Sequence, residues 1–376
     1  MNHPLPRSVD MLDNVYGARF LMRVAFDVPI KDGKVVNEFR IQRALPTIIY
    51  LIEKGARVIL LTHVGRDPKN TTLPILEVLQ RYISVKYVDA VVGEKVIGAV
   101  THMKEGTVLL LENLRSHEGE EANDEVFARE LATYGNFYVN EAFPVAHRKH
   151  ASVDALPRLM PNFAGFDFLH EVTELRKALA PAQPSLFILG GAKFETKAPL
   201  IEKFVNTYTH TFIGGALAND FLKGKGYEVG TSLVSDQSLA GNSILDDECI
   251  MLPQDVIVKG SRTIAVAEVA ADDAILDVGP ASLEALQPRI DGAKTILWNG
   301  PLGYYEGGFD AATKKCAEYV AASNAYSIVG GGDTEAAIEA LGLMDSFGFV
   351  STGGGAMLEF LEKGTLPALE ALTPRS

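Results

Sequence analysis

Three glycine-rich stretches in the second half of the chain decide the fold: Leu189-Gly190-Gly191-Ala192-Lys193, Val329-Gly330-Gly331-Gly332-Asp333-Thr334 and Ser351-Thr352-Gly353-Gly354-Gly355-Ala356. Each follows a short apolar run and leads into helix-forming sequence. A strand that turns through glycines into a helix presents unpaired backbone N–H groups at the positive end of the helix dipole, which suits phosphate. Three such turns, with acidic or lysine side chains beside them, indicate a polyphosphate bound together with a metal ion.

The composition indicates a large globular protein. A chain of 376 residues is too long for one ordinary core, so we expect two domains. Charged residues or glycines interrupt every apolar run before it reaches the length of a membrane span, so no membrane partner is expected. The start, Met1-Asn2-His3-Pro4, lacks a secretory signal pattern, and Cys249 and Cys316 suggest neither a disulfide framework nor a metal site. These features predict a cytoplasmic location.

The net charge of −13 argues against nucleic acid as a partner. It is unevenly distributed. Residues 1–170 carry 20 Lys and Arg against 21 Asp and Glu, a net of −1, whereas residues 171–376 carry 15 against 27, a net of −12. The first half is therefore the better host for an anionic substrate without a metal ion. The second half must bind an anion through backbone dipoles, a few lysines and a cation.

Strand and helix signals alternate along the whole chain. In the first half the strand-like runs are 20–26, 57–62, 85–88, 107–111 and 137–140, with helical sequence at 40–54, 73–82 and 124–134. The second half continues the pattern with runs at 186–189, 211–213, 255–258, 262–267, 274–277, 294–298, 326–329 and 347–350. This alternation predicts parallel sheets covered by helices on both faces. The stretch 168–180 reads as one helix that joins the two halves.

Basic side chains follow the strands of the first half. Ligands of open parallel sheets bind at the carboxyl ends of the strands. Those ends lead into His63-Val64-Gly65-Arg66, Arg115 and Ala146-His147-Arg148, and Arg40 opens a helix. Four arginines from separate turns that converge on one rim need an anion to offset their mutual repulsion. The acidic run Glu118–Glu121 is expected to be a solvated face.

The ordered motifs of the chain resemble those of the phosphoglycerate kinase family. The likeness covers nearly the whole chain and runs through Arg23–Pro29, His63–Arg66, Leu111–Arg115, Ala146–Arg148, Gly190–Lys193, Trp298–Pro301, Gly330–Thr334 and Ser351–Ala356. It implies reversible phosphoryl transfer between 1,3-bisphosphoglycerate and Mg-ADP, which gives 3-phosphoglycerate and Mg-ATP in glycolysis. It also implies an α/β fold of two Rossmann-like parallel-sheet domains joined by a hinge helix, with the C-terminal segment returning to the first domain.

The resemblance also implies domain limits and a state of assembly. Residues 1–167 would bind phosphoglycerate with 363–376 packed back on them, 168–180 would form the hinge helix, and 181–362 would bind the nucleotide. The protein would be a monomer. Neither a G-x-x-x-x-G-K-[ST] loop nor a G-x-G-x-x-G fingerprint occurs, which disfavours P-loop enzymes and Rossmann dehydrogenases.

By the same resemblance the first domain holds the phosphoglycerate. The implied substrate-binding residues are Ala25, Asp27, Arg40, His63, Val64, Gly65, Arg66, Arg115, His147 and Arg148. Arg66, Arg115 and Arg148, with His63, would grip the phosphate that is not transferred. Arg40 would face the carboxylate and the group in flight.

In the second domain the resemblance implies a site for ATP or ADP with Mg²⁺. Its implied nucleotide-binding residues are Gly191, Ala192, Lys193, Lys197, Gly215, Asn299, Pro301, Glu306, Gly330, Gly331, Gly332, Asp333 and Thr334. Asp333 would take the metal ion. Arg40, Lys197, Gly354 and Gly355 would act in catalysis, because a loose phosphoryl-transfer transition state needs positioning and positive potential.

The chain departs from the family pattern where Arg-Val-Asp-Phe-Asn reads Arg-Val-Ala-Phe-Asp. An acidic contact is lost at Ala25, and an acid appears at Asp27. On an extended strand both positions share one face, about 6.6 Å apart, so one carboxylate would stay near the substrate hydroxyl. Next to an anionic ligand it could instead repel. Pro144 and Val145 replace a Gly-Thr pair.

Two alternatives stay open at this point. The chain could be a non-catalytic, regulatory homologue that keeps nucleotide affinity and has lost the glycerate site. It could also be a kinase for a related phosphorylated carboxylic acid. Calorimetry with 3-phosphoglycerate and a substrate panel separate these readings.

Overall fold

The computed structural model describes residues 4–192 and 194–372. The chain divides into two compact units. The first contains the described residues up to Thr173 and from Lys363 onward, and the second runs over Glu174–Glu362. The division falls inside the helix α6, Phe166–Leu179.

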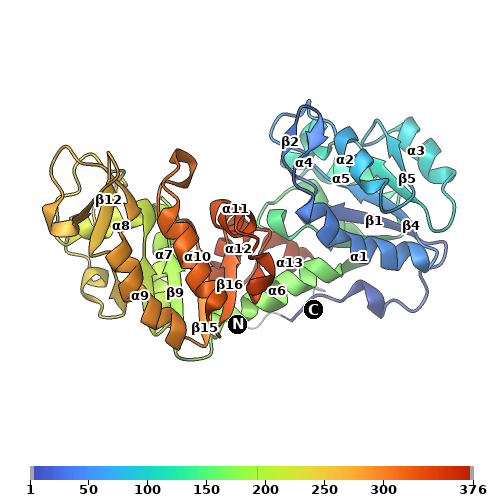
Figure 1. The fold of residues 1–376 in the computed structure, drawn as a ribbon. Coiled ribbons are helices and arrows are strands. Elements are labelled where there is room, and N and C mark those ends of the chain that lie inside the picture. The colour runs from blue at the N-terminus through green and yellow to red at the C-terminus, as the bar shows by residue number, and fades with distance from the viewer. Residues whose placement is uncertain (1–3, 193, 373–376) are drawn as a thin grey trace. The chain divides into compact units, whose positions relative to one another are not determined.

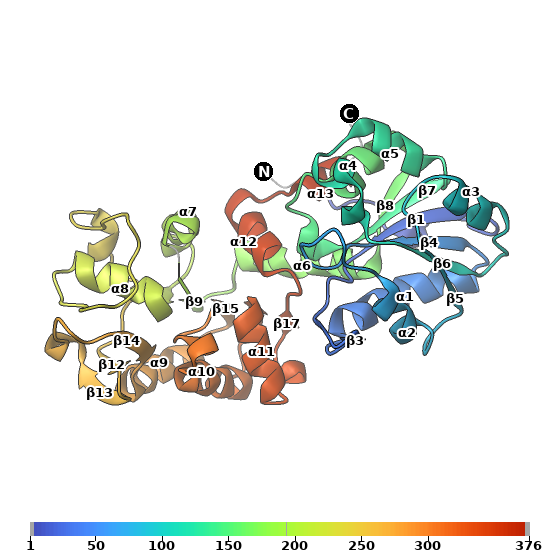
Figure 2. The same cartoon turned by 90° about the horizontal axis from the view of Figure 1, so that it is seen from above.

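The first unit is built on a parallel sheet of six strands in the order β5-β6-β4-β1-β7-β8. The strands are β1 (Arg19–Val24), β4 (Arg57–Leu61), β5 (Val85–Val88), β6 (Val108–Leu111), β7 (Phe137–Glu141) and β8 (Asn162–Ala164). The helices are α1 (Phe39–Glu53), α2 (Leu73–Leu79), α3 (Glu94–Thr101), α4 (Glu118–Glu121) and α5 (Glu125–Ala132). Figure 2 shows α1 and α2 on one face of the sheet and α4 and α5 on the other.

Burial on both faces explains the sequence of the central strand. All of β1 after Arg19 is buried, and Phe20, Met22 and Val24 belong to the core that α1 covers. A parallel strand covered on both sides reads as a continuous apolar run. Arg23 is the exception in this run, since a charged side chain at this depth requires partners.

The C-terminal segment packs on the first unit through α13 (Pro367–Leu372). Its backbone N–H at Ala368 donates to the carbonyl of Ala146 at 3.0 Å. Asn162 Nδ2 donates to the carbonyl of Ala371 at 3.3 Å. The return of this segment to the first unit, expected from the family likeness, is therefore confirmed.

The second unit has its own parallel sheet in the order β11-β10-β9-β15-β16-β17. The strands are β9 (Ser185–Leu189), β10 (His210–Ile213), β11 (Ile250–Met251), β15 (Thr295–Asn299), β16 (Tyr326–Gly330) and β17 (Phe349–Val350). The helices are α7 (Phe194–Val205), α8 (Gly215–Gly224), α9 (Pro280–Gly292), α10 (Ala311–Ala322), α11 (Gly332–Ala340) and α12 (Gly354–Lys363), most of them labelled in Figure 1. Trp298 is fully buried in the core of this unit. The α/β fold with two Rossmann-like parallel sheets is confirmed.

The expectation of parallel pairing is wrong for three strands of the second unit. β12 (Asp255–Val258), β13 (Arg262–Ala265) and β14 (Ile275–Val278) form a separate antiparallel sheet in the order β13-β12-β14. A turn at Lys259–Ser261 joins β12 to β13, with Gly260 at φ +85°. Such a short link permits only an antiparallel pair, because a parallel crossover needs a dozen or more residues.

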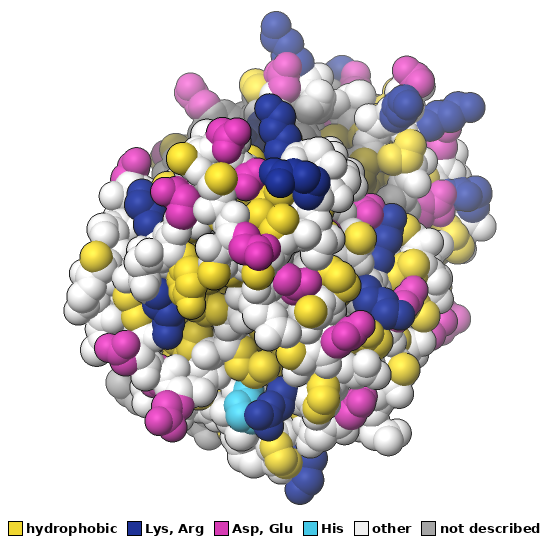
Figure 3. All heavy atoms as spheres, turned by 60° about the vertical axis from the view of Figure 1, so that its left-hand side comes forward, with side chains coloured by type: hydrophobic (Ala, Val, Ile, Leu, Met, Phe, Trp, Pro, Cys, Tyr) yellow, Lys and Arg dark blue, Asp and Glu magenta, His cyan; other side chains and the backbone are white. Residues whose placement is uncertain are grey.

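The outer surface mixes residue types. Figure 3 shows acidic, basic and apolar side chains interspersed over one face of the molecule. Within residues 4–192 and 194–372, no helix is both long and apolar enough to cross a membrane.

Candidate functional site

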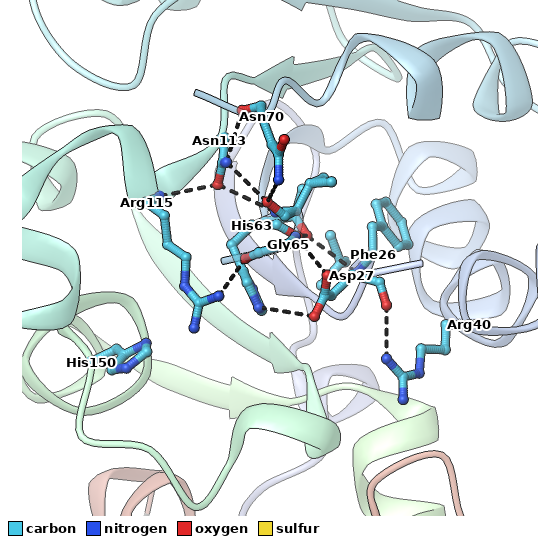
Figure 4. A network of polar contacts seen from close by, with 12 residues as sticks. Phe26, Asp27, Arg40, His63, Gly65, Asn70, Asn113, Arg115 and His150 are labelled. Atoms are coloured by element: carbon cyan, nitrogen blue, oxygen red, sulfur yellow. Dashed lines mark hydrogen bonds and ion pairs between the residues drawn. The ribbon is translucent and has the colours of Figure 1, made fainter. Parts of the chain in front are cut away.

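Asp27 links two strand ends of the first sheet. Its Oδ1 accepts a hydrogen bond from the Gly65 N–H at 2.8 Å, and its Oδ2 lies 3.4 Å from Nε2 of His63 (Figure 4). Its carbonyl accepts from Nη1 of Arg40 at 2.8 Å. Burial alone would raise the pKa of the Asp27 carboxyl, but the close contact with His63 and the hydrogen bond from Gly65 hold this pKa well below its ordinary value.

The geometry argued for Ala25 and Asp27 from the sequence is wrong. β1 ends at Val24, where its ladder with β7 also ends, so residues 25–29 are not strand. The alternation of a pleated strand therefore does not apply. Asp27 turns toward the His63–Gly65 loop instead, and Ala25 is nearly buried with 8% of its surface exposed.

His63 is held as a neutral ring. Its side chain is 2% exposed and Nδ1 lies 2.8 Å from Nη2 of the buried Arg23. Burial lowers the pKa of His63 to about 4, and the positive charges of Arg23 and Arg115 act in the same direction, whereas Asp27 opposes them. Val64, the next residue, is buried.

Three arginines gather at the same edge. Arg115, in the 3₁₀ turn η2 (Leu114–Ser116), donates to the carbonyl of Gly65 and pairs through Nε with Glu121 at 2.8 Å. The pKa of Arg148 is lowered by burial first and then by the nearby charges of Arg115 and Arg66. Arg66 itself is exposed, whereas Arg115 and Arg148 are half-buried. This mutual repulsion indicates a site built for an anion.

The loop after β7 supplies the remaining basic side chains of this edge. His147 and Arg148 follow the 3₁₀ turn η3 (Phe143–Val145). His150, which the sequence analysis did not single out, faces Arg115 in Figure 4. Burial lowers its pKa to about 4, and Arg23 and Arg148 add to the effect.

In the second unit a cavity of about 870 Å³ opens beside the glycine turns. The expected nucleotide-binding residues that line it are Gly191, Ala192, Gly215, Pro301, Glu306 and Asp333. Lys193 lies outside the described residues. The sequence analysis missed Asn219, Thr231, Ser232, Leu276 and Tyr304, which also line the cavity. These residues carried no sequence signal.

Backbone segments approach closely around this cavity. Gly215 has φ +61°, and a Cβ there would lie 2.6 Å from the backbone nitrogen of Gly191. A Cβ at Gly300, with φ +90°, would lie 2.6 Å from the carbonyl oxygen of Gly190. Only glycine permits both the conformation and the approach at these two positions.

Lys197 lies on α7 and points back toward the first glycine turn. Its Nζ donates to the carbonyl of Gly190, and 7% of the residue is exposed. Burial lowers the pKa of this ammonium to about 8. A desolvated cation beside this glycine turn is suited to phosphate oxygens.

The second glycine turn caps α11. Gly331, at φ +110°, is the N-cap residue, and Gly332 and Asp333 open the helix. Asn299 Nδ2 donates to the carbonyl of Gly330 at 3.1 Å. Within the described residues the Thr334 hydroxyl is buried and has no hydrogen-bond partner. A buried unpaired hydroxyl in the first turn of a helix favours a phosphate ligand.

The third glycine turn lies against the second. A Cβ at Gly354 would lie 3.2 Å from the Cα of Gly331. Gly354 and Gly355 are the first two residues of α12, so the N-terminal ends of α11 and α12 are neighbours. Two helix N-termini at one place concentrate positive potential.

The model of the phosphoglycerate kinase family matches residues 9–364. The chain belongs to the phosphoglycerate kinase family. A phosphoglycerate kinase of Methylorubrum extorquens is 43% identical over 392 residues, which cover 97% of this chain and 98% of the relative. That of Roseiflexus castenholzii is 42% identical over 381 residues, covering 95% and 96%.

Solved structures of phosphoglycerate kinases share the fold. The enzyme from Coxiella burnetii superposes with a TM-score of 0.85 at 34% identity, covering 98% of this chain and 99% of the other. The enzyme from Pyrococcus horikoshii OT3 gives a TM-score of 0.87 at 29% identity, covering 97% and 98%. As a family member the chain is a kinase that transfers a phosphoryl group between 1,3-bisphosphoglycerate and ADP, giving 3-phosphoglycerate and ATP in glycolysis.

Proposed function

We propose that the two sites divide the substrates of this phosphoglycerate kinase between them. The edge of the first unit that carries His63, Arg66, Arg115 and Arg148, called the cationic edge below, binds the phosphoglycerate. The glycine-lined cavity of the second unit binds the nucleotide. The observation that carries the proposal is the gathering of Arg148, Arg115 and Arg66 near His63. Burial lowers the pKa of Arg148, and the charges of Arg115 and Arg66 lower it further, an effect that a bound anion would offset.

In the first unit, His63, Arg66, Arg115 and Arg148 bind the phosphate that is not transferred. Arg40, in the first turn of α1, binds the carboxylate and the group in transfer. Its contact with the carbonyl of Asp27 supports this role, because that contact holds the guanidinium next to a residue whose side chain bonds to Gly65. Val64, Gly65 and His147 complete the pocket, with Ala25 and Asp27 beside the glycerate.

In the second unit, Lys197 and the backbone N–H groups of the glycine turns neutralise the phosphates of the nucleotide. Lys197 is buried, and its charge interacts more strongly with phosphate because the local dielectric constant is low. The starts of α11 and α12, at Gly332 and Gly354, add helix dipoles aimed at developing negative charge. Glu306 serves the ribose, and Asn299 and Pro301 border the cleft.

We also propose that Mg²⁺ accompanies the nucleotide and that Asp333 is its protein ligand. Asp333 lies in the first turn of α11 and lines the cavity. The described residues hold no cluster of three or more His, Cys, Asp or Glu side chains placed for a metal. A single carboxylate fits Mg²⁺ bound through substrate phosphates, because this ion keeps most of its water and takes one or two carboxylates. When bound, the ion neutralises phosphate charge.

The domain limits expected from the sequence, with a hinge helix at 168–180, form part of the proposal. The position of α6, at Phe166–Leu179, and the division of the compact units inside it support a hinge there. A cytoplasmic monomer is proposed from the family likeness. Gel filtration with light scattering tests the monomer, and scattering with and without both substrates tests the hinge.

The central experiment is a coupled assay of ATP consumption that depends on 3-phosphoglycerate. Arg40→Ala should lower kcat/KM by about 100-fold or more, because removing one charged donor from a transferring group costs this much. Arg129→Ala is the control, since Arg129 pairs with Glu125 on the exposed surface of α5. Equal activities of the two variants would contradict the assignment.

A further inference from the structure

The buried side chain of Arg23 makes three directed contacts. It is fully buried at the end of β1. Its Nε donates to Oγ of Ser152 at 2.9 Å, its Nη1 to the carbonyl of Val24, and its Nη2 lies 2.8 Å from Nδ1 of His63. A guanidinium carries only donors and stays charged, so burial at this depth is costly without a counter-charge.

Glu120 supplies that counter-charge through Ser152. The acidic run Glu118–Glu121 was expected to be solvated, and this is wrong for Glu120, which is fully buried. Its Oε1 accepts from Ser152 Oγ at 2.6 Å, and its Oε2 accepts from the Ser152 N–H at 2.9 Å. The hydroxyl proton of Ser152 is thus committed to Glu120, and a lone pair of Oγ faces Arg23.

These contacts fix the proton of His63. Because Arg23 can only donate, Nδ1 of His63 must accept, and the single proton of the neutral ring resides on Nε2. This Nε2 is buried and makes no hydrogen bond within the part of the chain that the structure describes. Asp27 Oδ2, at 3.4 Å, is too distant for a strong bond. An unsatisfied buried donor therefore faces the cationic edge.

We propose that Arg23, braced by Ser152 and Glu120, is a positioning residue that locks His63 in the Nε2–H tautomer and aims this N–H at the anion site. The proposal rests on the proposed function, which assigns the phosphate of phosphoglycerate to His63. The directed chain runs from the Glu120 carboxylate through Ser152 to Arg23, which donates to Nδ1 of His63. A donor fixed before the ligand arrives loses less entropy on binding.

The test removes the lock without leaving a charge unpaired. Arg23→Met combined with Glu120→Gln deletes both buried charges, which folded proteins tolerate far better than the loss of one partner. Glu120→Gln alone is the matched control, since it keeps the Arg23 donor. Ser152→Ala is a second control, which removes only the hydroxyl that links Arg23 to Glu120. Nitrogen chemical shifts of the ¹⁵N-histidine-labelled, substrate-free protein report the tautomer, and His63→Gln assigns the signal.

The wild-type protein and both controls should show His63 as a single Nε2–H tautomer at pH 7. The double variant should show a mixture, and its KM for 3-phosphoglycerate should rise about tenfold while its KM for ATP stays unchanged. An Nδ1–H or doubly protonated ring in the wild type would overturn the proposal. So would a double variant that keeps the single tautomer.

The two measurements separate this proposal from the proposed function. The tautomer is read without substrate and does not depend on which ligand binds. A double variant with mixed tautomers and an unchanged KM would support the lock by Arg23 and contradict the assignment of phosphoglycerate phosphate to His63.

Discussion

The two sites achieve affinity for anions by different means. In the first unit long cationic side chains attract the anion, and acidic residues such as the partly exposed Asp27 and the buried Glu120 help to orient them. In the second unit the backbone does so, through glycine turns at helix starts, with one buried lysine. Side-chain charge can be adjusted by single substitutions, whereas a backbone site tolerates change only where no Cβ is added. The family departures Ala25 and Asp27 lie in the first unit, which fits this difference.

The largest effect is expected where the backbone site depends on one side chain. Lys197→Ala should reduce kcat by about 1,000-fold, because the variant loses a desolvated cation that stabilises transferring charge. Lys223→Ala, at an exposed position of α8, is the control for loss of a lysine. If kcat of Lys197→Ala stayed within a few-fold of that of the control, the glycine turns alone would be sufficient to stabilise the transferring charge.

Gly215→Ala tests the backbone site directly. The left-handed conformation costs a non-glycine residue about 1–2 kcal/mol, and the new Cβ would press on the backbone of Gly191. Calorimetry should show ATP binding weakened about 10- to 100-fold with binding of 3-phosphoglycerate unchanged. Gly292→Ala, where an added Cβ meets nothing within 4 Å, is the control. Equal loss of both ligands would indicate general unfolding rather than a local site.

The first unit should respond to pH in a way that the backbone site does not. The pKa of His63 is lowered to about 4 from 6.5. Between these two pH values His63 is therefore protonated in the unfolded chain and neutral in the folded protein. The contribution of His63 to the free energy of unfolding is complete above pH 6.5, falls as the pH decreases, and is lost by about pH 4. The loss is on the order of 3 kcal/mol. Chemical denaturation from pH 7.5 to 4 measures it.

In that experiment the His63→Gln variant should show a shallower decline of the unfolding free energy over the same pH range. His150, whose pKa is also about 4, contributes in the same direction and remains in this variant. An unchanged slope in His63→Gln would mean that His63 titrates normally in the folded protein.

The smallest effect is expected from restoring the family residues in the first unit. Ala25→Asp with Asp27→Asn moves the carboxylate away from His63 and should lower the KM for 3-phosphoglycerate about three- to tenfold. The KM for ATP serves as the internal control. A higher KM for 3-phosphoglycerate would show that Asp27 is itself a favourable substrate contact.

Local patterns predicted the two parallel sheets, the glycine turns and the cationic edge, because each depends on residues close in sequence. The strands β12–β14 were misassigned as parallel because short strands rich in β-branched residues look alike in both kinds of sheet. The buried Glu120 was missed for another reason. Its partner Ser152 is 32 residues away, and no local pattern records which of several neighbouring glutamates faces inward.

The site residues divide in the same way. Basic residues directly after strands could be recognised from the sequence. His150 and the cavity residue Ser232 could not, since their positions depend on how loops fold back. The turn of Asp27 toward Gly65 follows from β1 ending at Val24, a limit set by its neighbour strand rather than by its own sequence.

The return of α13 to the first unit has a consequence for synthesis. Ala368 and Ala371 bond to the loop and strand region around Ala146 and Asn162, next to the segment that carries His147, Arg148 and His150. The ribosome makes these residues after the whole second unit. The first unit of the nascent chain therefore stays incompletely covered until the whole second unit has been synthesised, and its last packing step can come only after that synthesis.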